Sequence, residues 1–125
     1  MSLRAARAHH EVDGADHVDT VLLGGLEGPG MPRVHGKGVL ALHWDRLVLV
    51  TAAVPHHVVS VPLVQITKVD LTSALRLRGH WRRNKRHWLR IRWQTGTGVA
   101  TMGVVVPDPA RWARGLSHLD GRGTS

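Results

Sequence analysis

The sequence contains no cysteine, no phenylalanine and no tyrosine, and it has nine acidic residues against seventeen lysines and arginines. Without cysteine the chain has no disulfide, no thiolate zinc site and no cysteine nucleophile. No apolar run reaches the roughly 18 residues that a transmembrane helix needs. The first residues also lack the apolar core of a signal peptide, so a cytoplasmic location is expected, with a peripheral position at the inner face of the membrane as a variant of it.

Groups that serve catalysis are scarce as well. The two glutamates, Glu11 and Glu27, both lie in the N-terminal part of the chain. Asp45, Asp70 and Asp108 fit a turn, a strand end and a helix cap. No carboxylate pair and no Ser-His-Asp arrangement is defined by spacing. We therefore expect a protein that is not an enzyme and needs no cofactor.

Two local patterns superficially match ligand sites. Gly30 to Gly38 contains a Gly-Lys pair, but five residues separate Gly30 from Gly36 and Gly38 follows the lysine, which excludes a phosphate-binding P-loop. The stretch from His9 to His17 collects three imidazoles and three carboxylates. Such groups bind Zn²⁺, Ni²⁺ or Cu²⁺, but a metal also needs fixed geometry, which a glycine-containing tail does not offer. We expect no metal site.

Hydrophobic periodicity predicts one domain at residues 17–119, between a flexible His-rich tail at 1–16 and a short flexible tail at 120–125. Alternating, β-branched segments predict strands at 39–44, 46–51, 58–61 (with the pattern resuming after Pro62 at 63–71), 75–81, 87–93 and 99–106. Residues 19–23 could add a short first strand, and residues 24–32 are expected to form a glycine- and proline-rich loop. After Asp108 and Pro109 the period changes to that of a helix, in which Trp112, Leu116 and Leu119 share one face. The expected fold is mainly β (α+β): a curved antiparallel sheet or partly open barrel of six or seven strands, capped by one C-terminal helix.

The positive charge is local. Residues 76–92 contain seven arginines and one lysine, which is eight of the seventeen cations, and no acid occurs between Leu71 and Pro107. We expect 75–81 and 87–93 to pair as a hairpin, with Arg82 opposite Trp88 and Arg78 opposite Arg92. One face of this hairpin would then be cationic, and Trp81 and Trp93 would face the core. The candidate anion- or partner-binding residues are Arg76, Arg78, Arg82, Arg83, Lys85, Arg86, Trp88, Arg90 and Arg92.

The order of motifs resembles the GRAM and bacterial pleckstrin-homology-like (PH-like) domains. The resemblance rests on an apolar strand from Gly38, the hairpin Asp45-Arg-Leu-Val-Leu, the strand Val61-Pro-Leu-Val-Gln-Ile-Thr-Lys-Val and a closing helix that carries Trp112. It spans residues 17–119 and implies a PH-like fold and a binding or adaptor role toward lipid head groups, peptides or protein subunits.

Several partners suit a cationic face that contains tryptophan. An acidic protein or an anionic membrane surface is preferred, because each cation near such a surface contributes about 1 kcal/mol. The same arginines and Trp88 also suit single-stranded nucleic acid, although no RRM, KH or helix-turn-helix signature is present. The remaining hypotheses are a structural subunit of an assembly, including a homo-oligomer, and a solvated arginine-rich face without a ligand.

Overall fold

The segments with alternating hydrophobicity form strands, but several of these strands begin or end at residues different from those that the sequence predicts. The computed structural model describes residues 3–124, apart from the side chains of residues 84, 85 and 117–124. The elements in chain order are α1 (Leu3–Arg7), η1 (His10–Val12), β1 (His17–Glu27), β2 (Gly36–Leu42), β3 (Arg46–Thr51), β4 (Val58–Pro62), η2 (Leu63–Gln65), β5 (Ile66–Leu77), β6 (His80–Gln94), β7 (Val99–Val105) and α2 (Pro109–Thr124).

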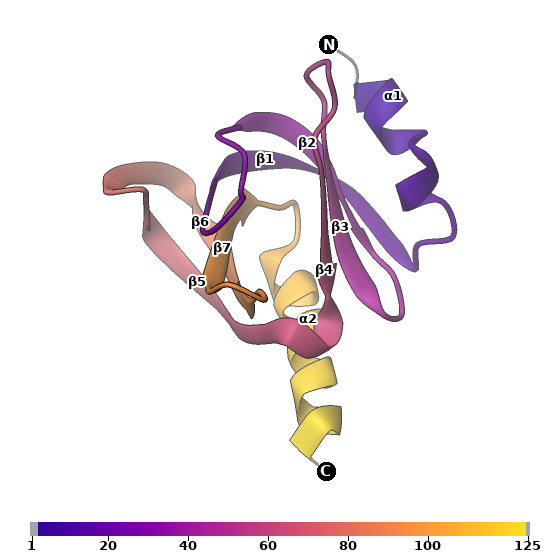
Figure 1. Cartoon of the computed structure of the whole chain (residues 1–125), viewed down its shortest axis with the longest axis vertical. Coiled ribbons are helices and arrows are strands. Elements are labelled where there is room, and N and C mark those ends of the chain that lie inside the picture. Colours follow the sequence, from indigo (N-terminus) through magenta and orange to yellow (C-terminus); the bar gives the residue numbers. More distant parts are fainter. Residues whose placement is uncertain (1–2, 125) are drawn as a thin grey trace.

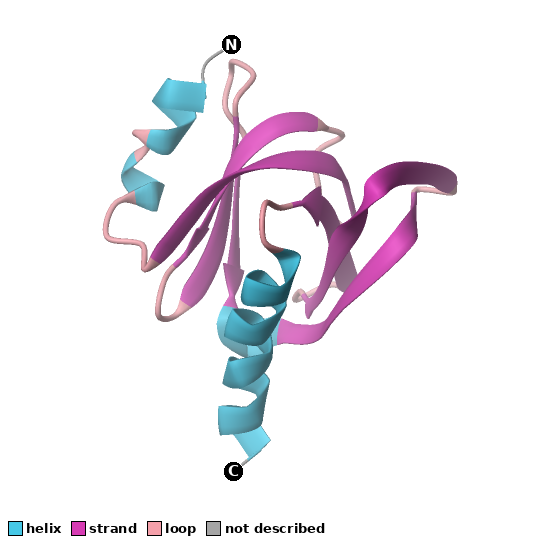
Figure 2. Cartoon of the chain, turned by 180° about the vertical axis from the view of Figure 1, so that it is seen from behind, coloured by secondary structure: helices cyan, strands magenta, loops and turns pink. Residues whose placement is uncertain are grey.

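All the strands belong to one antiparallel, seven-stranded sheet in the order β4-β3-β2-β1-β7-β6-β5. The sheet curves so that β2–β4 and β5–β7 form two walls, and β1 lies between them (Figure 1). The first turns of α2 lie between these walls (Figure 2). A mainly-β curved sheet with a C-terminal helix is therefore confirmed.

Strand β1 is longer than expected and holds the centre of the sheet. Residues 24–27, which we expected to open a loop, continue the strand to Glu27. They do so because the register against β7 shifts between Leu23 and Gly25, an irregularity that keeps the strand paired while it bends. Up to Leu23 the strand also pairs with β2. The pairing with both neighbours makes β1 the connection between the two walls.

The core fills the concave side of the sheet, and α2 closes it. Trp112 and Leu116 are buried among the inward side chains of the strands. The indole Nε1 of Trp112 donates a hydrogen bond to Asp19 Oδ2 at 2.7 Å, and the His17 ring stacks on the indole. Asp108 Oδ1 accepts from the backbone N of Arg111, as expected of an N-cap. The helix ends at Thr124, so residues 120–124 do not form the separate tail that we expected.

The N-terminal segment also differs from the flexible tail that we expected for residues 1–16. Ala6 of α1 is fully buried and Val12 of η1 is 6% exposed, both against outward side chains of β2 and β3. His9 Nδ1 accepts a hydrogen bond from the backbone N of Glu11, and the ring of His43 lies 2.7 Å from the Glu11 carbonyl oxygen. The apolar residues in this segment are too few to show periodicity, but they suffice to cover a patch of the sheet.

Within residues 3–124, the histidines and acids of this segment do not converge on a metal geometry. None of the described helices combines the length and the apolar character that crossing a membrane requires.

Candidate functional site: the β5–β6 hairpin

The cationic hairpin exists, but its turn and its register differ from the prediction. Strand β5 ends at Leu77 and β6 begins at His80, so the turn consists of Arg78 and Gly79, with φ angles of 52° and 79°. We expected Arg82 opposite Trp88 and Arg78 opposite Arg92, and this pairing is wrong. Arg82 lies opposite Leu75, because the strands reverse at the turn rather than at residues 83–87.

Contacts far away in the sequence hold this turn. A positive φ is costly for a residue other than glycine, and Arg78 adopts one because both its backbone and its side chain are fixed. Its backbone N donates to Glu27 Oε2 at 2.6 Å. Its guanidinium donates to the carbonyl oxygens of Leu26 and Met31, each at 2.9 Å. Arg78 therefore joins the hairpin tip, the end of β1 and the loop after it, and this role is structural.

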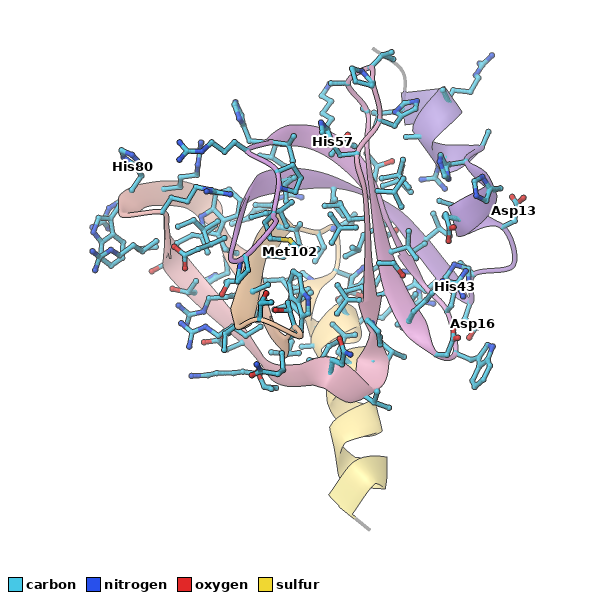
Figure 3. The ribbon with its side chains drawn as sticks, in the orientation of Figure 1. Asp13, Asp16, His43, His57, His80 and Met102 are labelled. Carbon is cyan, nitrogen blue, oxygen red and sulfur yellow. The ribbon has the colours of Figure 1, made fainter. Side chains whose placement is uncertain are left out.

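The hairpin has a base and a tip. Between Thr72 and Ala74 the register shifts, so that residues 84–87 of β6 face only Ser73 of β5. The base comprises 66–72 with 88–94, and the tip comprises 74–83. The tip projects from the body of the molecule, with His80 at its far end (Figure 3). A bulge of this kind lets the tip turn relative to the base.

One side of the hairpin carries exposed cations around a tryptophan. Arg76 lies opposite Trp81 in the register, with its Cζ 5.8 Å from the centroid of the indole ring, and Arg83 follows on the same side. Trp81 is 62% exposed, whereas we expected it to face the core. Together with Arg90 and Arg92 of the base, Arg76 and Trp81 line a shallow hollow of about 410 Å³. We call Arg76, Trp81, Arg83 and Arg92 the outer face.

Arg90 is not a free cation of this face. Its Nε and Nη2 donate to the two oxygens of Asp70, at 3.0 and 2.5 Å, from the directly opposite position on β5. The hydrogen bonds from Arg90 hold the pKa of Asp70 below its usual value, and they raise the pKa of Arg90. Arg92 faces Lys68 instead, a pairing of like charges that destabilises the sheet. Asp70 lies one residue before the acid-free segment, so the absence of acids within that segment did not reveal it.

Trp88 is not part of the cationic face either. It is 3% exposed, because Leu75 and Leu77 of the tip fold over it and form a small apolar cluster with Val105. Gly24 of β1 leaves room for this cluster: a Cβ at Gly24 would lie 2.7 Å from Trp88 Cζ3. The indole Nε1 of Trp88 has no hydrogen-bond partner among the described residues. The alternation in the sequence placed Trp88 on the correct side of β6 but could not show that the tip covers it.

The remaining candidates are Arg86, Lys85 and Arg82, and the two arginines do not belong to the outer face. Arg86 is exposed beside a separate, mainly apolar hollow that Leu22, Val105 and Pro107 help to line. The side chain of Lys85 lies outside the described residues. Arg82 is exposed, but on the side of the tip opposite Arg76.

The side of the tip that carries Arg82 faces a second concavity, which sequence reasoning missed. A cavity of about 480 Å³ lies between the tip, the glycine-containing end of β1 and the loop before β2. Its cationic or imidazole side chains are Arg33, His35, Arg78, His80 and Arg82. We call this cavity the tip pocket. Arg33 and His35 lie more than 40 positions before the hairpin turn in the sequence, and the hydrogen bond from Arg78 to Met31 joins their loop to that turn.

No protein-family model, curated protein or solved structure matches this chain. Any functional assignment therefore rests on the geometry of the hairpin.

Proposed function

We propose that this chain is a non-enzymatic, PH-like binding module whose outer face contacts an anionic membrane surface. The observation that carries the proposal is Trp81, which is 62% exposed on a projecting tip and has Arg76 over its ring. Tryptophan favours the interface between lipid and water, and neighbouring arginines bind the negative charge of the head groups. In this proposal the protein is cytoplasmic and peripheral at the inner face of the membrane.

The arrangement of the carboxylates supports a binding role rather than a catalytic one. Asp70 binds Arg90, Asp19 binds Trp112, and Glu27 accepts a hydrogen bond from the turn. Each of these carboxylates therefore stabilises a contact between two elements. The curved sheet closed by a helix that carries Trp112 is what the PH-like resemblance leads one to expect, and it supports that part of the proposal.

Vesicle flotation tests the proposal. The wild-type protein should float with phosphatidylcholine vesicles that contain phosphatidylglycerol and should not float with phosphatidylcholine alone. Arg76→Gln/Arg83→Gln/Arg92→Gln should weaken binding about a hundredfold, since each of three cations contributes about 1 kcal/mol at an anionic surface. Trp81→Ala should weaken it further.

The matched control is Arg4→Gln/Arg111→Gln/Arg114→Gln, which removes the same charge from exposed positions on the two helices. Equal flotation with neutral vesicles, or an equal loss in this control, would contradict the proposal. Binding of single-stranded RNA without flotation, measured by mobility shift at several salt concentrations, would favour the nucleic-acid alternative. Capture of a defined acidic protein without flotation would favour an adaptor for protein partners.

A further inference from the structure

The tip pocket concentrates positive charge, and Glu27 beside it accepts a hydrogen bond from the backbone N–H of Arg78 rather than from a guanidinium. The lining of the pocket contains three arginines and two histidines and no aspartate or glutamate. The side chains of Arg33, His35, His80 and Arg82 form no hydrogen bond or ion pair with the described part of the chain. Arginines that pack for structural reasons find acceptors, as Arg78 and Arg90 do. The side chains of these four pocket residues are exposed and therefore solvated in the free protein. With no carboxylate in the lining, they give this concavity a positive potential that attracts an anionic ligand.

The cavity suits a small molecule better than a single ion. A volume of about 480 Å³ lies within the range of small-molecule sites, about 300–1,000 Å³. Gly24 and Gly25 of β1 also line the cavity, and the space beside their Cα atoms is taken by Trp88, Leu75 and Leu77. Leu77 and Val34 add apolar surface to the walls, beside Trp81 at the rim. The lining thus combines cations for an anionic group with apolar surface for an organic one.

The directions from which the cations come distinguish phosphate from carboxylate. Arg33 comes from the loop before β2 and Arg82 from β6, so two guanidinium groups that bind no other described residue border the cavity from different segments, and Arg78 borders it from the turn. A carboxylate presents two oxygens in one plane, which a single arginine binds in a bidentate manner. A phosphate monoester presents three oxygens in different directions and carries nearly two charges, so it can accept from several donors at once.

We propose that the tip pocket binds the phosphate group of a small phosphorylated molecule. Arg33 and Arg82 bind the phosphate from two different segments of the lining, and His35 and His80 are further hydrogen-bond donors. Arg78 keeps the walls in place, since its guanidinium is already bound to Leu26 and Met31. Trp81 borders both this site and the outer face. The arginines that bind the phosphate are not part of the outer face, so the proposal does not depend on that face contacting a membrane.

The first experiment uses glycerol 3-phosphate as the probe and contains no vesicles. In titrations followed by amide NMR, the probe should shift the signals of Gly24, Gly25, Val34 and His80. Arg33→Gln/Arg82→Gln, the pocket variant, should weaken binding by at least about tenfold. The reason is that charge-assisted hydrogen bonds from arginine to phosphate are about twice as strong as hydrogen bonds between neutral groups. Arg111→Gln/Arg114→Gln removes the same charge from α2 and should bind as the wild type does.

The second experiment separates the two sources of a phosphate monoester, a soluble metabolite and a lipid head group. Vesicles with phosphatidic acid present the same group as glycerol 3-phosphate, whereas phosphatidylglycerol presents a diester. Binding of free glycerol 3-phosphate that the pocket variant abolishes supports a soluble ligand. Preference for phosphatidic acid over phosphatidylglycerol, lost in the pocket variant, supports a lipid ligand. The proposal is overturned if neither probe shifts the pocket amides, if succinate shifts them equally, or if the pocket variant binds as well as the wild type.

Discussion

Arg78 Nε donates a hydrogen bond to the carbonyl oxygen of Leu26 at 2.9 Å, and this contact joins the turn of the hairpin to the end of β1 across 52 residues of sequence. The same guanidinium reaches Met31, so a single side chain fixes the relative positions of both walls of the tip pocket. The positive φ of Arg78 is maintained by these bonds and not by any preference of arginine.

Substitutions at Arg78 can separate the stability that its side-chain hydrogen bonds contribute from the cost of its positive φ. Arg78→Ala should lower the free energy of unfolding by about 2–3 kcal/mol, through the lost hydrogen bonds and the strain of alanine at positive φ. Arg78→Gly loses the same bonds without the strain and should be more stable than the alanine variant by up to about 1 kcal/mol. Urea denaturation followed by circular dichroism measures both. At Arg83, in the extended strand, the order should reverse, with alanine more stable than glycine. An alanine variant at Arg78 as stable as the glycine variant would show that the turn carries no strain.

The ion pair between Asp70 and Arg90 predicts a dependence of stability on pH. The pKa of Asp70 is lower in the folded protein than its ordinary value of 3.8, chiefly because Arg90 donates hydrogen bonds to the carboxylate. The pair therefore stabilises the fold above pH 3.8, and the contribution disappears as the pH falls through the folded-state pKa. At neutral pH, Asp70→Asn should cost on the order of 1 kcal/mol.

The measurement compares the urea midpoints of the wild type and Asp70→Asn from neutral to acidic pH. The two curves should converge at the acidic end. Asp45→Asn is the matched control, since the carboxylate of Asp45 is 43% exposed beside Arg46 and should contribute little. A difference between the wild type and Asp70→Asn that stays constant with pH would contradict the assignment.

The close packing of Trp88 and Leu75 against Gly24 predicts that a side chain at this position would loosen the tip from the sheet. A methyl group there would lie 2.7 Å from Trp88 Cζ3 and 2.9 Å from Leu75 Cδ2, and both side chains are buried. Gly24→Ala should destabilise the protein by about 1–3 kcal/mol through overpacking. It should also accelerate amide hydrogen exchange in the tip, at residues 74–77 and 80–83.

Gly96 provides the comparison, because a Cβ there would meet no atom within 4 Å. Gly96→Ala should change stability by less than about 0.5 kcal/mol. Unchanged exchange in the tip of Gly24→Ala would show that the cluster of Leu75, Leu77 and Trp88 does not hold the tip.

The sequence predicted those features that depend on local pattern. Alternation identified the strands, and the change of period at Asp108 identified the helix, its cap and the buried Trp112. The pattern also located the cationic hairpin. It did not locate the turn, because the conformation of Arg78 also depends on bonds to distant residues, which the pattern does not show.

The features that the sequence pattern did not predict depend on contacts between distant segments. Trp88 is buried because Leu75 and Leu77 fold back over it, which requires both the register shift in the hairpin and a glycine in β1. The tip pocket has the same origin, since Arg33 lies 49 positions before Arg82 in the sequence. Gly79 was the one local signal for the observed turn, because a glycine between two alternating segments favours a chain reversal.

The place of β5 at one end of the sheet has a consequence for the behaviour of the protein at high concentration. An edge strand leaves backbone groups unpaired, and a second copy of the chain can add to it and begin aggregation. β5 is twelve residues long and forms such an edge, but Lys68 is exposed on it, opposite Arg92. Two copies that met at this edge would bring these like charges together. The pairing of Lys68 with Arg92 weakens the sheet locally, and the same charges protect the edge from self-association.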